Sequence, residues 1–118
     1  MAYTPQIASA STDGRCVKIA ATASPGTTLH TAVASATDMD EIYIWVSNSS
    51  AAAVGLTIEF GGTTNPDDRI VNTLSIPANS PPILIVPGVR LRNSLVVKAF
   101  ASSANVLIAA VNVNRLAA

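Results

Sequence analysis

Two runs of residues with a period of two, at positions 41–47 and 54–60, constrain the fold more than any other feature of this chain. Residues 41–47 place three apolar side chains on one face of an extended chain: Ile42, Ile44 and Val46. Residues 54–60 do the same with four: Val54, Leu56, Ile58 and Phe60. A period of two is typical of β-strands, because successive side chains point to opposite faces of the pleat. The small polar residues 48–52 tolerate turn backbone, so we predict an antiparallel hairpin with one apolar face.

An apolar face on a hairpin needs a second sheet to cover it, and further short runs along the chain can provide one. The runs that we expect to form strands are residues 15–22, 28–35, 69–76, 83–86, 94–101 and 105–113. Turn formers separate them at intervals of roughly 8–12 residues, which is typical of a β-sandwich or barrel. The alanines of residues 104–118 also permit a helix, but the β-branched residues there favour a strand.

We therefore predict an all-β fold, a single antiparallel β-sandwich domain over residues 15–118 that is jelly-roll-like and has about eight short strands. The chain of 118 residues is long enough for one such two-layer core. Five side chains are expected in that core: Val46, Leu56, Ile58, Val97 and Ile108.

Residues 1–14 contain few apolar side chains and two breakers, Pro5 and Gly14. We expect them to form an extended N-terminal arm that is mobile in the isolated protein; a disordered terminus is the alternative. On a neighbouring subunit the arm would be ordered by main-chain hydrogen bonds, with Tyr3, Pro5 and Ile7 as its anchors. The segment has no basic stretch followed by an apolar one, so we do not expect a signal peptide.

Charged residues make up only 12% of the chain, about half of the roughly 25% that is usual in soluble domains. Interface cores are depleted in charge, so this deficit predicts an oligomer or a component of a larger assembly. Seven basic residues balance seven acidic ones, which argues against a nucleic-acid partner and against a basic helix on a membrane surface. The one cysteine, Cys16, cannot form an internal disulfide and is expected to be a small buried residue.

Residue types that usually carry chemistry are sparse. His30 is the one histidine and lies within an alternating run, where we expect a strand-face residue rather than a catalytic base. The acidic groups at residues 38–41 and 67–68 lack the spacing of an EF-hand, and loop aspartates usually form turns. Residues 61–64 lack the ending of a phosphate-binding loop. We expect no catalytic residue, no cofactor and no metal, with Ca²⁺ at the acidic loops as the weaker alternative.

Tyr43 and Trp45 lie on the face of their strand opposite its apolar side chains. Aromatic rings on an exposed strand can stack on sugars, but they also fill cores and anchor subunit interfaces. Aromatic residues make up only 4% of the chain, so a sugar platform would be thin. We expect an interface or core role for this pair, with glycan binding as the alternative.

The order of motifs over residues 40–113 resembles that of a known family. The landmarks are a strand ending in Val46-Ser47-Asn48-Ser49, a strand running into Gly61-Gly62-Thr63, and two turns, Ile76-Pro77-Ala78-Asn79-Ser80 and Ala101-Ser102-Ser103-Ala104-Asn105. Together they are similar to small β-sandwich structural proteins of tailed bacteriophage virions, which are found as capsid decoration (cement) proteins and in fibres or tails.

The resemblance implies a non-enzymatic protein that binds and reinforces a phage capsid. Its partner would be the major capsid protein, its location the capsid surface after synthesis in the bacterial cytoplasm, and its oligomer a homotrimer; no nucleic acid and no membrane are implied. Two alternatives stay open: a fibre, tail or head–tail component, and, from another class, a carbohydrate-binding module for host attachment. The interaction residues that we predict are Tyr3, Pro5, Ile7, Tyr43 and Trp45.

Overall fold

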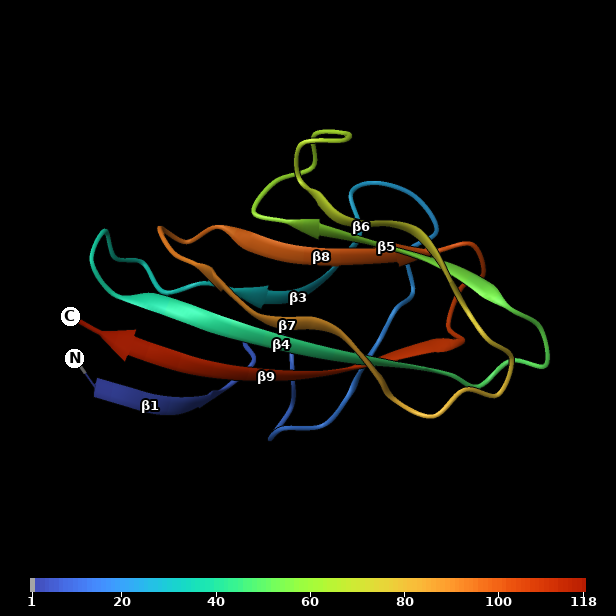
Figure 1. The fold of residues 1–118 in the computed structure, drawn as a ribbon, viewed down its shortest axis with the longest axis horizontal. Coiled ribbons are helices and arrows are strands. Elements are labelled where there is room, and N and C mark those ends of the chain that lie inside the picture. Colours follow the sequence, from blue (N-terminus) through green and yellow to red (C-terminus); the bar gives the residue numbers. More distant parts are fainter. Residues whose placement is uncertain (1) are drawn as a thin grey trace.

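Two antiparallel sheets pack face to face in the computed structural model, which describes residues 2–118 (Figure 1). No residue in that range is helical. The strands are β1 (Ala2–Ile7), β2 (Val17–Lys18), β3 (Thr27–Thr31), β4 (Met39–Asn48), β5 (Val54–Phe60), β6 (Arg69–Ile76), β7 (Ile83–Leu91), β8 (Val96–Ala101) and β9 (Leu107–Ala117). The predicted all-β sandwich is confirmed.

The strand order in the two sheets is that of a jelly roll. The first sheet has the order β1-β9-β4-β7, with β2 also paired to β9, and the second sheet has the order β3-β8-β5-β6. β1 and β2 pair with successive parts of one edge of β9, at residues 112–117 and 108–109. With β1 and β2 taken as one interrupted strand, the order is that of two Greek keys folded across two sheets.

The predicted hairpin between residues 41–47 and 54–60 is wrong, although both runs are strands. β4 belongs to the first sheet and β5 to the second, and their apolar faces meet across the core. Asn48 turns the chain from one sheet to the other. Its buried Nδ2 donates to three carbonyl oxygens at 3.0 to 3.1 Å, and its Oδ1 accepts from the N–H of Ser50 at 2.8 Å. Alternation defines the two faces of a strand but does not identify its neighbour.

Four of the five predicted core residues are fully buried between the sheets: Val46, Leu56, Ile58 and Val97. The prediction is wrong for the fifth residue, Ile108, which lies half-buried on the outer side of the first sheet. Its neighbours Leu107 and Ala109 point into the core instead. β9 therefore alternates between its faces, since the second sheet covers only one of them.

Residues 2–7 form an edge strand on their own domain, which corrects the expectation of a free arm that docks only on a neighbour. β1 pairs with residues 112–117 of β9 along its whole length. Its side chains are largely exposed, but strand pairing uses main-chain groups and needs little side-chain contact. Ala8 then enters the core. Met1, the first residue of the predicted arm, lies outside the described residues.

The predicted strand over residues 15–22 is reduced to the two residues of β2. Cys16, just before it, is exposed, so the expectation of a small buried residue is wrong. Ile19, just after it, is fully buried and anchors this part of the chain in the core. Its N–H donates to the carbonyl oxygen of Leu107 at 2.9 Å, which continues the contact with β9 beyond the regular pairing.

β7 continues through Pro87 and Gly88, beyond the predicted end of this strand at residue 86. The pairing with β4 shifts register at this point, and the edge position of β7 accommodates a proline. Gly88 has a φ of +85°, which glycine adopts without the penalty that a Cβ brings. A Cβ here would lie 2.8 Å from Cζ of Tyr43. The Tyr43 ring therefore lies over the backbone of β7.

Candidate functional site

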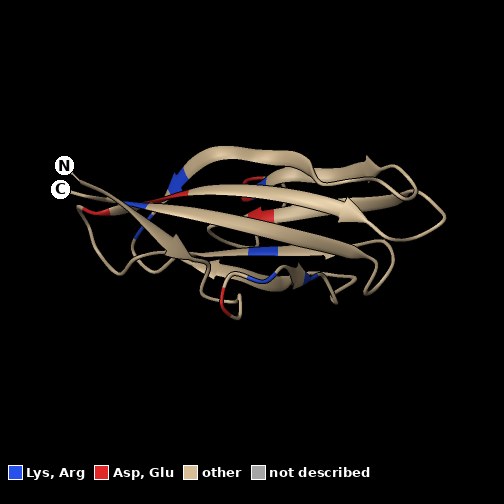
Figure 2. Ribbon diagram, turned by 90° about the horizontal axis from the view of Figure 1, so that it is seen from below, with Lys and Arg blue, Asp and Glu red and all other residues tan. Residues whose placement is uncertain are grey.

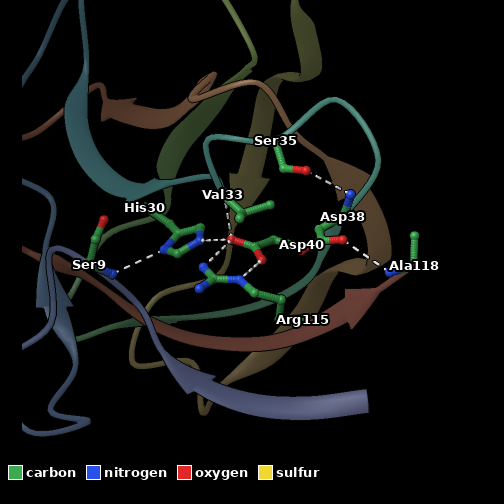
Figure 3. Close-up of polar contacts among 8 residues, drawn as sticks. All are labelled: Ser9, His30, Val33, Ser35, Asp38, Asp40, Arg115 and Ala118. Carbon is green, nitrogen blue, oxygen red and sulfur yellow. Dashed lines mark hydrogen bonds and ion pairs between the residues drawn. The ribbon is translucent and has the colours of Figure 1, made fainter. Parts of the chain in front are cut away.

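A buried polar cluster lies between the sheets, and Figure 3 shows its contacts. Asp40 of β4 is its centre and has no exposed surface. Oδ1 of Asp40 accepts from Nε of Arg115 at 2.7 Å, and Oδ2 accepts from Nη2 of Arg115 at 3.0 Å. Oδ2 also accepts from Nε2 of His30 at 2.7 Å and from the N–H of Val33 at 3.1 Å. One carboxylate thus joins β3, β4, β9 and the loop after β3.

The neighbours of Asp40 hold its carboxylate in the ionised form. Burial by itself would raise the pKa of Asp40, but the hydrogen bonds from Arg115 and His30 and the positive charge of Arg115 outweigh burial. The pKa of Asp40 therefore lies below its ordinary value of 3.8. The same hydrogen bond raises the pKa of Arg115. The pair is a two-point, charge-assisted contact, which is the strongest kind of side-chain hydrogen bonding.

Ser9, His30 and Asp40 are the residue types of a catalytic triad, but their contacts differ from those of a triad. The backbone N–H of Ser9 donates to Nδ1 of His30 at 3.0 Å. Nδ1 therefore carries no proton, and the proton on Nε2 is donated to Asp40. The hydroxyl of Ser9 accepts from the N–H of Thr31 at 2.7 Å. A triad places the hydroxyl on the imidazole, so this arrangement does not activate Ser9.

The cluster clamps the two ends of the chain. Ser9 follows β1 and Arg115 belongs to β9, so both terminal strands are fixed to the same centre. Asp38 adds a further contact, because its Oδ1 accepts from the N–H of Ala118 at 3.0 Å. The two termini lie side by side at one end of the sandwich (Figure 1). The geometry indicates a structural role for His30, which the sequence placed on a strand face.

A second buried carboxylate, Glu59 of β5, lies on the side of the second sheet that faces away from the core. The hydroxyl of Ser24 donates to its Oε2 at 2.5 Å, and the N–H of Gly26 donates to its Oε1 at 2.8 Å. Gly26 also packs closely on β8, since a Cβ there would lie 2.5 Å from the carbonyl oxygen of Ala99. These contacts anchor the loop between β2 and β3 to the second sheet.

The outward side of the first sheet, here called the outer face, carries all five predicted interaction residues. They are Tyr3, Pro5 and Ile7 on β1 and Tyr43 and Trp45 on β4. β9 lies between the two strands and sets their register, because Ile7 and Tyr43 are both opposite Asn112. The structure thus brings the two groups of residues, which the sequence treated separately, to one surface.

Glu41 connects two tyrosines of the outer face, Tyr3 on β1 and Tyr43 on β4. Its Oε2 accepts from the hydroxyl of Tyr3 at 3.4 Å, and its Oε1 accepts from the hydroxyl of Tyr43 at 3.1 Å. Arg90 of β7 lies opposite Glu41, with Nε 3.7 Å from Oε2. The hydrogen bond to Glu41 is the main cause that raises the pKa of Tyr43. Glu41 is thus shared by two tyrosines and one arginine.

Trp45 lies beside Tyr43, with ring centroids 6.1 Å apart and ring planes within 20° of parallel. Next to Trp45 is a shallow hollow of about 260 Å³ that reaches Gly14 and Asn112. Within residues 2–118 the Asn112 side chain forms no hydrogen bond. The hollow therefore combines an aromatic ring with a free amide.

Large apolar side chains remain uncovered on the outer face. Tyr3 is 58% exposed, Ile7 59% and Leu84, opposite Trp45, 44%. Charged residues lie near the end that carries the termini and in the middle of the sandwich, whereas the opposite end is free of charge (Figure 2). An uncovered aromatic and apolar surface of this kind is typical of protein interaction sites.

Three polar contributors to the outer face were missed from the sequence: Glu41, Arg90 and Asn112. Glu41 alternates in phase with Tyr43 and Trp45, so the period of two already placed it on their face. Arg90 and Asn112 join this face only through the pairing of β7 and β9 with β4. That pairing has no local signature in the chain.

Comparison with known proteins adds no relative: no family model, no curated protein and no solved structure matches the chain. Between residues 2 and 118, the structure has no helix that could cross a membrane. In the same range, no group of three or more His, Cys, Asp or Glu side chains is placed to hold a metal ion.

Proposed function

We propose that this protein is a non-enzymatic virion structural protein of the capsid decoration type, which docks on the capsid through its outer face. The observation that carries the proposal is the outer face itself. Its strands present Tyr3, Ile7, Tyr43, Trp45 and Leu84 there with little charge between them. Aromatic side chains dominate the energetics of protein interfaces, and charge is depleted at interface centres.

The docking mechanism differs from that of a free arm. β1 is already paired with β9, so Tyr3, Pro5 and Ile7 act as part of a preformed surface. A surface that needs no folding on binding avoids the ordering entropy of a disordered segment. The sandwich would lie across joints between capsid subunits and add buried area to contacts that internal pressure strains. Many copies on one lattice stabilise it through mass action and multivalency.

Electrostatics on this surface sets orientation more than affinity. Glu41 and Arg90 are its main charged pair, and Glu41 is already occupied by two tyrosine hydroxyls. A partner would therefore meet fixed hydroxyl groups and aromatic edges around Glu41, with the exposed side chain of Arg90 beside them. Such contacts give geometric specificity at a low cost in side-chain entropy.

The test is co-sedimentation with purified phage particles that lack the protein, followed by low-resolution imaging to count copies. The full chain should bind in many copies spread over the shell. Trp45→Ser should weaken retention at least about tenfold, as loss of a central aromatic anchor does. Leu74→Ser is the control, because Leu74 is an exposed large apolar side chain that belongs to the second sheet. A handful of copies at one vertex would instead indicate a tail or head–tail component.

A carbohydrate-binding module for host attachment is the second candidate, and the hollow beside Trp45 favours it. An aromatic face next to the free amide of Asn112 suits a pyranose ring, whose C–H groups stack while its hydroxyls take hydrogen bonds. Binding to a glycan array that Trp45→Ser and Asn112→Ala both abolish, with no binding to particles, would replace the decoration proposal with this one.

A further inference from the structure

A second hollow, separate from the one beside Trp45, lies at the end of β7 next to the turn into β8. Its volume is about 310 Å³, which is at the lower end of the range for ligand sites. Three apolar side chains form one part of its lining: Met39, Leu91 and Leu95. Two arginines and an asparagine complete the lining: Arg90, Arg92 and Asn93. The hollow is thus lined by both apolar and cationic residues.

The positive charge at this hollow is only partly compensated. Arg90 has Glu41 as its ion-pair partner, at 3.7 Å, and Glu41 also accepts two tyrosine hydroxyls. Within residues 2–118 the Arg92 side chain forms no hydrogen bond and no ion pair. Of the two arginines, only Arg90 has a carboxylate partner, and that carboxylate also accepts two tyrosine hydroxyls. An anion bound in the hollow would neutralise the positive charge that has no partner within the fold.

The backbone that carries Arg92 is held rigidly. Asn93 and Ser94 both have a φ of +59°, the left-handed conformation that two-residue turns of this kind require. The N–H of Asn93 donates to the carbonyl oxygen of Ser35 and the N–H of Ser94 to that of Val33, each at 3.2 Å. Left-handed backbone at two successive non-glycine residues costs free energy and persists where the surroundings fix it. Arg92 is therefore presented from a preorganised turn, which lowers the entropy cost of binding.

We propose that this hollow binds a carboxylate that a partner polypeptide carries next to an apolar side chain. The planar guanidinium fork matches a carboxylate in two-point hydrogen bonding. The apolar part of the lining, which includes Leu95 with 44% of its surface exposed, gives the neighbouring aliphatic group a place to pack. Arg90 lies on the outer face opposite Glu41, so the hollow continues the surface that docks on the partner.

The partner segment is defined by its chemistry, a carboxylate next to an apolar side chain, and it need not belong to a capsid. It is tested on the isolated full chain, so its failure is distinguishable from failure of the decoration proposal, which is tested on particles. The probe is acetyl-Leu-Glu-Leu-amide, titrated into isotope-labelled protein while NMR follows the Met39 methyl, the Leu91 and Leu95 methyls and the Arg92 Nε–H. Saturable shifts confined to these groups are expected.

Matched variants and probes decide the outcome. Arg92→Gln should weaken peptide binding about tenfold, the loss expected for one charge-assisted contact, whereas Arg15→Gln, which removes an exposed arginine elsewhere, should leave it unchanged. Acetyl-Leu-Gln-Leu-amide should bind much more weakly than the glutamate peptide. Three results overturn the proposal: no saturable shift, equal binding of the glutamine peptide, or the same shifts with inorganic phosphate at the same concentration. Unchanged amide spectra of Arg92→Gln away from the turn confirm that the variant is folded.

Discussion

Replacing Asp40 with asparagine should markedly destabilise this fold. The substitution would keep the size of the side chain, but the new amide group must face either the Nε of Arg115 or the three donors that now meet Oδ2. Either orientation sets donor against donor. Arg115 would also lose its counter-charge in a site where Asp40 is fully buried.

The magnitude follows from these contacts. Removing one partner of a buried ion pair costs about 3–5 kcal/mol. The Arg115 side chain is 31% exposed, so water partly compensates its charge, and the lower end of that range applies. We expect a loss of about 3 kcal/mol in the free energy of unfolding, which corresponds to a fall of roughly 10–15 °C in Tm for a chain of this size.

Urea denaturation at pH 7 measures this change, with Asp67→Asn as the control, because Asp67 lies in an exposed loop. Asp67→Asn should change the free energy of unfolding by less than about 0.5 kcal/mol. A loss below about 1 kcal/mol for Asp40→Asn, with an unchanged m-value, would refute the view that the cluster clamps the terminal strands.

The pH dependence gives an independent check on the same residue. The pKa of Asp40 is lower in the folded protein than its ordinary value of 3.8. Its ionised form therefore stabilises the fold at pH values above the unfolded pKa, and this contribution is lost as the pH falls through the folded pKa. The stability difference between the wild type and Asp40→Asn should be full above about pH 5 and should shrink progressively below it. A difference that stays constant down to about pH 2 would contradict the assignment.

Three further predictions concern other parts of the molecule. Gly26→Ala should cost about 1–3 kcal/mol of stability, because its Cβ would lie 2.5 Å from the carbonyl oxygen of Ala99 and rigid backbone must move; an unchanged denaturation midpoint would show that the loop adapts freely. Deleting residues 2–7 should lower stability by roughly 1–2 kcal/mol, since β1 is paired with β9; an unchanged thermal transition would restore the free-arm hypothesis. The purified protein should form a homotrimer, measured by light scattering at micromolar concentration, and a monomer that persists on concentration would count against oligomerisation outside the lattice.

The sequence predicted which way side chains face better than it predicted which strands are neighbours. The alternation of residues 41–47 and 54–60 correctly placed Ile44, Leu56 and Ile58 in the core. It could not decide between a hairpin and two strands stacked across the core, because both arrangements bury the same faces. The choice depends on Asn48, whose side chain holds three carbonyl groups at the crossing between sheets.

The candidate sites show the same division. Residues 3–7 alternate as a strand does, but residues 1–14 as a whole contain few apolar side chains, so the sequence suggested an arm. The main-chain pairing with β9 that holds residues 2–7 cannot be recognised from composition. The buried cluster joins His30 and Asp40, 10 residues apart, to Arg115, 75 residues beyond Asp40. No local pattern marks such a group. It follows only from the jelly-roll order, which brings β3, β4 and β9 together at one end of the core.

The location of the acidic residues makes the surface poorer in charge than the composition suggests. Three of the seven acidic residues are buried: Asp40, Glu41 and Glu59. They bind partners within the fold, so the charges that repel neighbouring molecules and maintain solubility are correspondingly fewer. The surface of the first sheet instead carries three large exposed side chains, Tyr3, Ile7 and Leu84. A surface with this composition favours contact with other protein, because covering it gains free energy from apolar burial and sacrifices little charge hydration. The low charge of the surface and the apolar outer face therefore have one origin: three carboxylates stabilise the interior, and large apolar side chains remain on the surface.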